Sequence, residues 1–254
     1  MSTSIDFTTD SEENIIECKN ITIALDSREV LTGASCSIPK NSLTFLVGEN
    51  GSGKTSLVRS ILGLVPVTKG TISIHSSNGK PVIGYVPQNI EFPKQFQLTV
   101  TEYLNYSAKV SPKLVDTVLK RVDFPENQAK SRITELSGGQ VQKLLLAAEL
   151  YRSPDILFLD EPLSNVDDAS EKHIIDFILE IKNQGVSIVI ITHDWQMVSG
   201  YANHVICLNK NYICETSPTC ICRSALSKVD IKNIQKAIPD ANTRHEGYCY
   251  IENI

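Results

Sequence analysis

The chain has 254 residues, a length that can bury the core of one large domain with an attached sub-domain. Its formal net charge of −5 argues against a nucleic-acid partner held on a basic face. Hydrophobic residues make up 41% of the chain, as in ordinary globular proteins, and no apolar run approaches the ~20 residues that cross a membrane. Any membrane role is therefore expected to come through a partner protein.

Residues 1–14 are expected to form a disordered tail, because Met1–Glu13 is polar and acidic. This stretch has neither the basic start nor the apolar segment of a secretory signal, so the cytoplasm is the default compartment. In that compartment the seven cysteines are expected to be reduced thiols and not a disulfide framework.

Two strands are expected to lead into the domain as an antiparallel pair. Ile15–Ala24 is rich in β-branched residues and is interrupted near Lys19-Asn20. Val30–Ile38 follows after a turn at residues 26–28 and is ended by Pro39.

A phosphate-binding loop follows this pair. The pattern G-x-x-x-x-G-K-[ST] is met by Gly48-Glu49-Asn50-Gly51-Ser52-Gly53-Lys54-Thr55, between a predicted strand (Leu43–Val47) and a predicted helix (Ser56–Leu62). The glycines let backbone N–H groups approach a phosphate closely, and the helix N-terminus adds partial positive charge. Lys54 can reach the β and γ phosphates and the Thr55 hydroxyl can ligate Mg²⁺. A chance glycine-rich turn is the weaker alternative, given this context.

The middle of the chain changes character. Gly70–Ile74 and Val82–Val86 are predicted as strands around a turn at residues 76–79. Strand patterns are then absent until Arg132, and Thr101–Lys109 and Pro112–Val122 are predicted as helices. We expect a small helical subdomain over about residues 92–136.

An α/β pattern returns after this insertion. The expected elements are a helix at 139–151, a strand at 156–159, a helix at 167–183, a strand at 187–191 and a hairpin at 203–208 and 212–214. Strands that alternate with helices predict a parallel sheet covered on both faces. Beyond Ser217 the pattern weakens, with one possible helix at Lys228–Ala237.

Two carboxylates follow the apolar strand Ile156–Leu159. A buried strand would deliver Asp160 and Glu161 at its carboxyl end, where open α/β sheets bind ligands. Asp160 is placed to hold Mg²⁺ and Glu161 to polarise an attacking water. An exposed turn that merely closes a strand is the alternative, and the phosphate loop makes it the weaker one.

A second anion site is predicted at Ser137-Gly138-Gly139-Gln140, where glycines precede a long helix. One phosphate-binding loop is enough to hold a triphosphate, so the presence of a second anion site in the chain needs another explanation. Here the chain resembles the ATP-binding-cassette (ABC) ATPases. The signature loop of that family has this sequence, and it completes the nucleotide site of the opposite subunit.

The resemblance runs from about Ile15 to Cys214. Gln88 matches the family's Q-loop glutamine, which touches Mg²⁺. Asp167, in Ser164-Asn165-Val166-Asp167, matches the D-loop aspartate, and His193 matches the switch histidine that contacts the γ-phosphate. The resemblance implies an α/β fold with a P-loop NTPase core of the ABC type, an antiparallel lead-in sheet and the helical subdomain. The ATPase domain would span 15–217 and a C-terminal extension 218–254.

Two features are less typical. The position where the family stacks adenine on an aromatic falls on Leu25, so weaker or less base-selective binding is expected. A loose Cys/His cluster lies near the end, but its spacing favours unpaired cytosolic thiols over a zinc site. Its members are Cys207, Cys214, Cys220, Cys222 and His204.

Within the family the chain looks most like the ATPases of zinc, manganese and iron importers. This resemblance rests on the sequence of the D-loop and on the sequence from His193 to Cys214. This resemblance implies ATP and Mg²⁺ as cofactors and a homodimer on the cytoplasmic face of the inner membrane. It also implies an integral membrane permease as partner and, through the permease, an extracytoplasmic solute-binding protein; no nucleic acid is expected. The alternatives are the ATPase of another small-solute ABC transporter, or a soluble non-transport cassette such as an iron–sulfur assembly type.

Overall fold

The chain forms two compact units. The computed structural model describes residues 5–8, 13–26, 28–76, 79–88, 90, 92–93, 95–163, 168–193, 195–209 and 212–216. The first unit joins the residues up to Pro81 to those from Ser187 onward, and the second is Val82–Val186. The possible helix at Lys228–Ala237 lies outside the described residues.

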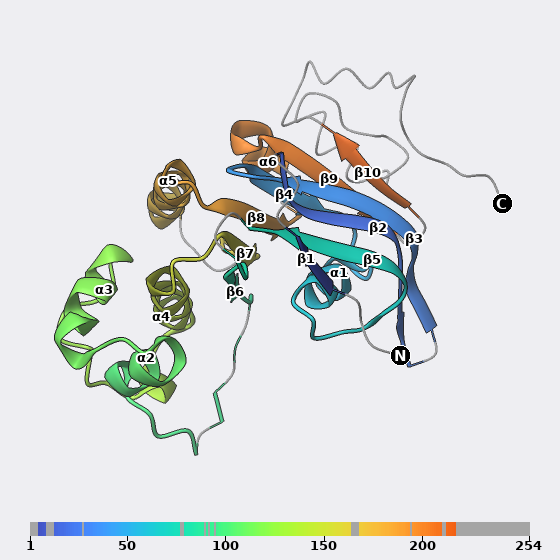
Figure 1. Cartoon of the computed structure of the whole chain (residues 1–254). Coiled ribbons are helices and arrows are strands. Elements are labelled where there is room, and N and C mark those ends of the chain that lie inside the picture. The colour runs from blue at the N-terminus through green and yellow to red at the C-terminus, as the bar shows by residue number, and fades with distance from the viewer. Residues whose placement is uncertain are drawn as a thin grey trace. The chain divides into compact units, whose positions relative to one another are not determined.

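The first unit contains a sheet with the strand order β1-β5-β2-β3 (Figure 1). β2 (Asn14–Leu25) is antiparallel to both β3 (Arg28–Pro39) and β5 (Val67–His75), so the predicted antiparallel lead-in is confirmed. β1 (Ile5–Thr8) lies parallel to β5, where a disordered tail over 1–14 was expected. Its alternating Ile-Asp-Phe-Thr sequence suits a strand, and β5 provides an edge for it to pair with.

The predicted interruption of β2 is a bulge. Asn20 adopts a left-handed conformation with φ of 50°, and the pairing of β2 with both neighbours shifts register between residues 18 and 22. Gly70 of β5 faces this bulge, and a Cβ atom there would overlap the carbonyl oxygens of Lys19 and Asn20. A glycine is therefore required where the two backbones approach.

A second sheet in the first unit is mostly parallel. β8 (Ser187–Thr192), β4 (Leu43–Val47) and β9 (His204–Asn209) run in the same direction, and β10 (Tyr212–Thr216) closes the edge as an antiparallel hairpin. Every residue of β4 and β8 is buried, as in strands covered on both faces. Helix α1 (Lys54–Ile61) follows β4, and α6 (Trp195–Tyr201), which was not predicted, follows β8.

The second unit combines two parallel strands with helices. β6 (Ile83–Val86) pairs with β7 (Ile156–Asp160). The helices are α2 (Val100–Ala108), α3 (Val115–Arg121), α4 (Gly138–Tyr151) and α5 (Asp168–Asn183), with short 3₁₀ turns η1 (Pro112–Leu114) and η2 (Ile133–Glu135). Both α2 and α3 pack on α4.

The two strands predicted on either side of residues 76–79 do not pair with each other. β5 pairs with β1 and β2, whereas β6 pairs with β7. Strand partners depend on distant parts of the chain. No helix among the described residues is long and apolar enough to cross a bilayer.

Candidate functional site

The predicted phosphate loop connects β4 to α1, as the motif requires. Gly48, Gly51 and Gly53 have φ values of 155°, 79° and 106°, which favour glycine. A Cβ atom at Gly48 would overlap the carbonyl oxygen of Leu208 on β9 and lie 2.9 Å from Ser52 Oγ. The loop therefore lies against the backbone of β9, and only a glycine fits at its first position.

The side chain of Lys54 is folded over this loop. Its Nζ donates hydrogen bonds to the carbonyl oxygens of Gly48 at 2.7 Å and Glu49 at 2.9 Å, and the residue is buried. Ser52 is also buried, and among the described residues its Oγ has no hydrogen-bond partner. A buried donor without a partner is costly, so its presence here fits an anionic ligand in the loop. Thr55 and Asn50 are exposed and Ser56 is half-buried.

His193 lies at the same sheet edge as the loop. β4 and β8 are parallel neighbours with Val47 opposite Thr192, so Gly48 and His193 both follow the carboxyl ends of paired strands. This edge is where open α/β sheets bind ligands. Leu25, at the end of β2, is 40% exposed, which leaves an aliphatic surface at the predicted adenine position.

A second group of predicted residues meets in the other unit. β6 and β7 are parallel with Val86 opposite Leu159, so Gln88, Asp160 and Glu161 all lie at the carboxyl ends of two paired strands. Glu161 has a φ of 49°, an uncommon conformation for a residue with a side chain, and such residues concentrate at functional sites.

Tyr85 also belongs to this group, although sequence reasoning did not single it out. Its hydroxyl donates a hydrogen bond to Asp160 Oδ2 at 3.3 Å. The signal available in the sequence was its position three residues before Gln88, in a strand that the sequence predicted.

The Ser137–Gln140 segment forms the N-terminus of α4. Ser137 is the N-cap: the Gln140 N–H donates to Ser137 Oγ at 3.4 Å, and the Ser137 N–H donates to Gln140 Oε1 at 2.9 Å. This capping box holds the helix start in place. Ser137, Gly138 and Gly139 are exposed, and a Cβ atom at either glycine would meet nothing within 4 Å. The side chain of Gln140 is engaged in the cap and with Gln128, to which its Nε2 donates at 3.1 Å.

Three aromatic side chains of the second unit contact one another. Phe92 stacks on Phe96 with ring centroids 5.2 Å apart and meets Tyr103 edge-on at 6.0 Å. Burial raises the pKa of the Tyr103 hydroxyl, with a smaller contribution from the negative charge of Glu149. Burial likewise raises the pKa of Glu149, although its ion pair with Arg152 at 3.0 Å opposes the shift.

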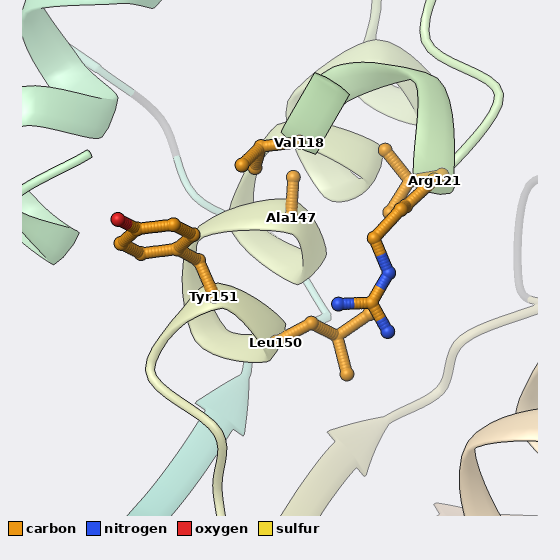
Figure 2. A pocket seen from close by; sticks show the side chains of 6 residues that line it. Val118, Arg121, Ala147, Leu150 and Tyr151 are labelled. Carbon is orange, nitrogen blue, oxygen red and sulfur yellow. The ribbon is translucent and has the colours of Figure 1, made fainter. Parts of the chain in front are cut away.

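A small pocket lies between α3 and α4. Figure 2 shows Val118 and Arg121 of α3 facing Ala147, Leu150 and Tyr151 of α4. The pocket has room for about one water molecule and contains none of the predicted site residues. It is a packing defect of the helices and not a nucleotide site.

Some predicted residues lie outside the described part of the chain. These are the D-loop segment Ser164–Asp167, which includes the predicted site residue Asp167, and Cys220 and Cys222 of the cysteine cluster. Cys207 and Cys214 lie opposite each other in the β9–β10 hairpin. Among the described residues no group of three or more His, Cys, Asp or Glu side chains could hold a metal ion.

A different pair of cysteines meets in the lead-in sheet. Cys18 and Cys36 are register partners on β2 and β3, and both are buried. A hydrogen bond with Cys18, and then burial, raise the pKa of the Cys36 thiol well above its ordinary value. A thiol held neutral in this way is a packing group and not a reactive one.

A glycine-lined loop between a buried strand and a helix, at the carboxyl edge of a parallel sheet, defines a nucleoside-triphosphate-binding α/β protein. Residues 31–164 match the family model described as "ABC transporter". The chain therefore belongs to the ABC transporter family, as the sequence motifs predicted, and it is an ATPase.

Similarity to known proteins supports this family assignment. The chain is 35% identical over 234 residues to the zinc import ATP-binding protein ZnuC of Buchnera aphidicola subsp. Acyrthosiphon pisum, covering 91% of this chain and 97% of that protein. It is 33% identical over 207 residues to the manganese transport system ATP-binding protein MntB of Bacillus subtilis, covering 76% and 83%. A solved dimeric post-hydrolysis ATP-binding cassette bound to ADP and Pi has the same fold, with a TM-score of 0.68, 22% identity and coverage of 80% and 98%.

Proposed function

We propose that this chain is the ATP-hydrolysing subunit of an ABC importer of a transition-metal ion, zinc first and manganese or iron next. The observation that carries the ATPase part is the loop from Gly48 to Lys54, which is shaped by glycine and holds a buried ammonium group. The metal part is supported by the relatives, which are named for zinc import and manganese transport.

The predicted site residues are proposed to bind and hydrolyse ATP. Lys54 and the N–H groups of residues 48–56 hold the phosphates, and His193 contacts the terminal one. Thr55, Gln88 and Asp160 supply hydroxyl, amide and carboxylate oxygens, the donor types that Mg²⁺ prefers. When bound, Mg²⁺ would neutralise charge on the β and γ phosphates. Glu161 then orients the attacking water and accepts its proton.

The working form is proposed to be a homodimer. Ser137, Gly138 and Gly139 present an exposed helix N-terminus, and in this proposal they bind the ATP held by a second copy, together with Gln140 and Asp167. The dimeric cassette of the same fold supports such an arrangement. Because each copy would contribute half of each site, ATP should draw two copies together.

Glu161→Gln tests the ATPase assignment. The amide keeps the shape of the side chain but cannot accept the proton, so we expect ATP binding to persist, turnover to fall at least ~100-fold, and a dimer to appear by light scattering when ATP is added. Glu126→Gln, an exposed acid in the same unit, is the control and should behave as the parent. Parental turnover in Glu161→Gln would overturn the role of Glu161, and a monomer at saturating ATP would overturn the dimer.

The transport role requires partners. We propose an integral membrane permease, an extracytoplasmic solute-binding protein that reaches this subunit only through the permease, and a peripheral position on the cytoplasmic face of the cell membrane. The cluster of Phe92, Phe96 and Tyr103 supports a helix-in-groove contact with the permease, alongside its role in packing.

Deleting the gene and measuring cellular zinc, manganese and iron separates the alternatives. Loss of zinc uptake at limiting zinc supports the proposal, and selective loss of manganese or iron uptake would reassign the metal. Unchanged uptake of all three with loss of another solute would favour another small-solute transporter. If the protein also failed to co-purify with membranes, a soluble cassette such as an iron–sulfur assembly type would be favoured.

A further inference from the structure

We propose that Tyr85 is a positioning residue for the ATPase reaction: its hydroxyl fixes the carboxylate of Asp160 in the orientation that receives the divalent cation of the nucleotide. The inference rests on the proposed role of Asp160 and deepens it. Tyr85 acts through Asp160, so it is not a catalytic residue in its own right.

The strand register explains how the two side chains meet. Tyr85 of β6 lies opposite Phe158 of β7 in a parallel pair. Side chains alternate along a strand, so Phe158 and Asp160 share one face of the pair, and Tyr85 shares the face of its register partner. Diagonal neighbours across two strands are ~7–8 Å apart, which a tyrosine can span. The hydroxyl accordingly reaches Asp160 Oδ2 at 3.3 Å.

The hydrogen bond is one restraint on the rotation of the Asp160 side chain. β7 is fully buried from Ile156 to Leu159, and Asp160 is the first residue of the strand that is only half-buried. The terminal torsion of an aspartate has a broad distribution, so packing alone does not set the plane of its carboxylate. A hydrogen-bond donor fixed on a strand narrows the range of orientations of the carboxylate. Partners of this kind, which hold a ligand and do not touch the metal, commonly affect metal affinity.

Tyr85→Phe removes only the hydroxyl and keeps the ring. Free Mn²⁺ would be titrated by electron paramagnetic resonance in the presence of a non-hydrolysable ATP analogue, with the full chain. We expect the Kd of Mn²⁺ to rise about three- to tenfold, less than the ~10–100-fold typical of such partners, because 3.3 Å is long for an O–H···O bond. Affinity for the analogue without metal should stay within about twofold of the parent, since Tyr85 does not bind phosphate. Hydrolysis should fall at limiting Mg²⁺ and recover when Mg²⁺ is raised.

Tyr151→Phe is the matched control, because Tyr151 is also half-buried in the second unit and lies at the far end of α4. It should leave the Kd of Mn²⁺ unchanged. Asp160→Ala is measured as well, so that failure of the inference about Tyr85 can be distinguished from failure of the proposed metal role of Asp160. Parental Mn²⁺ affinity in Tyr85→Phe, with weak binding in Asp160→Ala, would refute the role of Tyr85 alone. Parental affinity in both variants would refute the proposed metal role of Asp160. A lower melting temperature in Tyr85→Phe with unchanged Mn²⁺ affinity would make Tyr85 a packing residue only.

Discussion

Gly48→Ala should disrupt the phosphate loop far more than the same change three residues later. The new methyl group at position 48 would overlap the carbonyl oxygen of Leu208, a backbone atom of β9 that cannot rotate away. At Gly51, by contrast, a Cβ atom would meet nothing within 4 Å, although φ is 79°. Both substitutions therefore carry the conformational cost of a side chain at positive φ. Only Gly48→Ala also carries the cost of a steric overlap with β9.

The magnitudes follow from these two terms. Gly51→Ala should lose about 1–2 kcal/mol of unfolding free energy, the cost of a left-handed residue. Gly48→Ala adds overpacking against a fixed backbone, about 1–3 kcal/mol more, for a total loss of about 2–5 kcal/mol. Because the loop must move away from β9 to relieve the overlap, Gly48→Ala should also lose most of its ATP affinity.

Urea unfolding of both variants and of the parent measures the first effect, and binding of a fluorescent ATP analogue measures the second. If Gly48→Ala and Gly51→Ala differ by less than about 0.5 kcal/mol in unfolding free energy, the loop does not pack on β9 as described. Equal and undiminished ATP affinity in both variants would show that the contact with Leu208 has no part in forming the site.

Two further predictions concern α4. Burial is the leading cause that raises the pKa of Glu149 above its ordinary value of 4.5. Because Glu149 ionises more readily in the unfolded chain, the free energy of unfolding should fall as the pH rises from 4.5 through the raised pKa. Glu149→Gln cannot ionise and should flatten this decline in thermal melts between pH 4.5 and 7.5; a parental pH slope would contradict it. Ser137→Ala removes the N-cap that Gln140 donates to and should cost about 0.5–2 kcal/mol in urea unfolding. Ser111, the N-cap of η1 without a side-chain cap bond, is the control, and an equal effect of Ser111→Ala would refute this role of Ser137.

Local signals made much of the fold predictable from sequence. The break in β2 at Asn20, the turn into β3 and the start of β7 depend on residues within a few positions of one another, and each was predicted to within about two residues. The phosphate loop is the strongest case, because spacing alone places Lys54 where its side chain folds over Gly48. β1 could not be predicted in this way, since its four residues form a strand only where β5 offers an edge.

The partner of β6 explains why the sequence did not single out Tyr85. If β5 and β6 formed a hairpin, Tyr85 would pair with a strand that carries no acid at its end. The observed pairing of β6 with β7 instead joins residues more than seventy positions apart, and only this pairing brings a tyrosine hydroxyl to Asp160. Motifs identify groups that act through their own chemistry, such as Asp160 and Glu161. Groups that act by holding another side chain depend on strand register, which in a parallel sheet is fixed by distant contacts and leaves little trace in the local sequence.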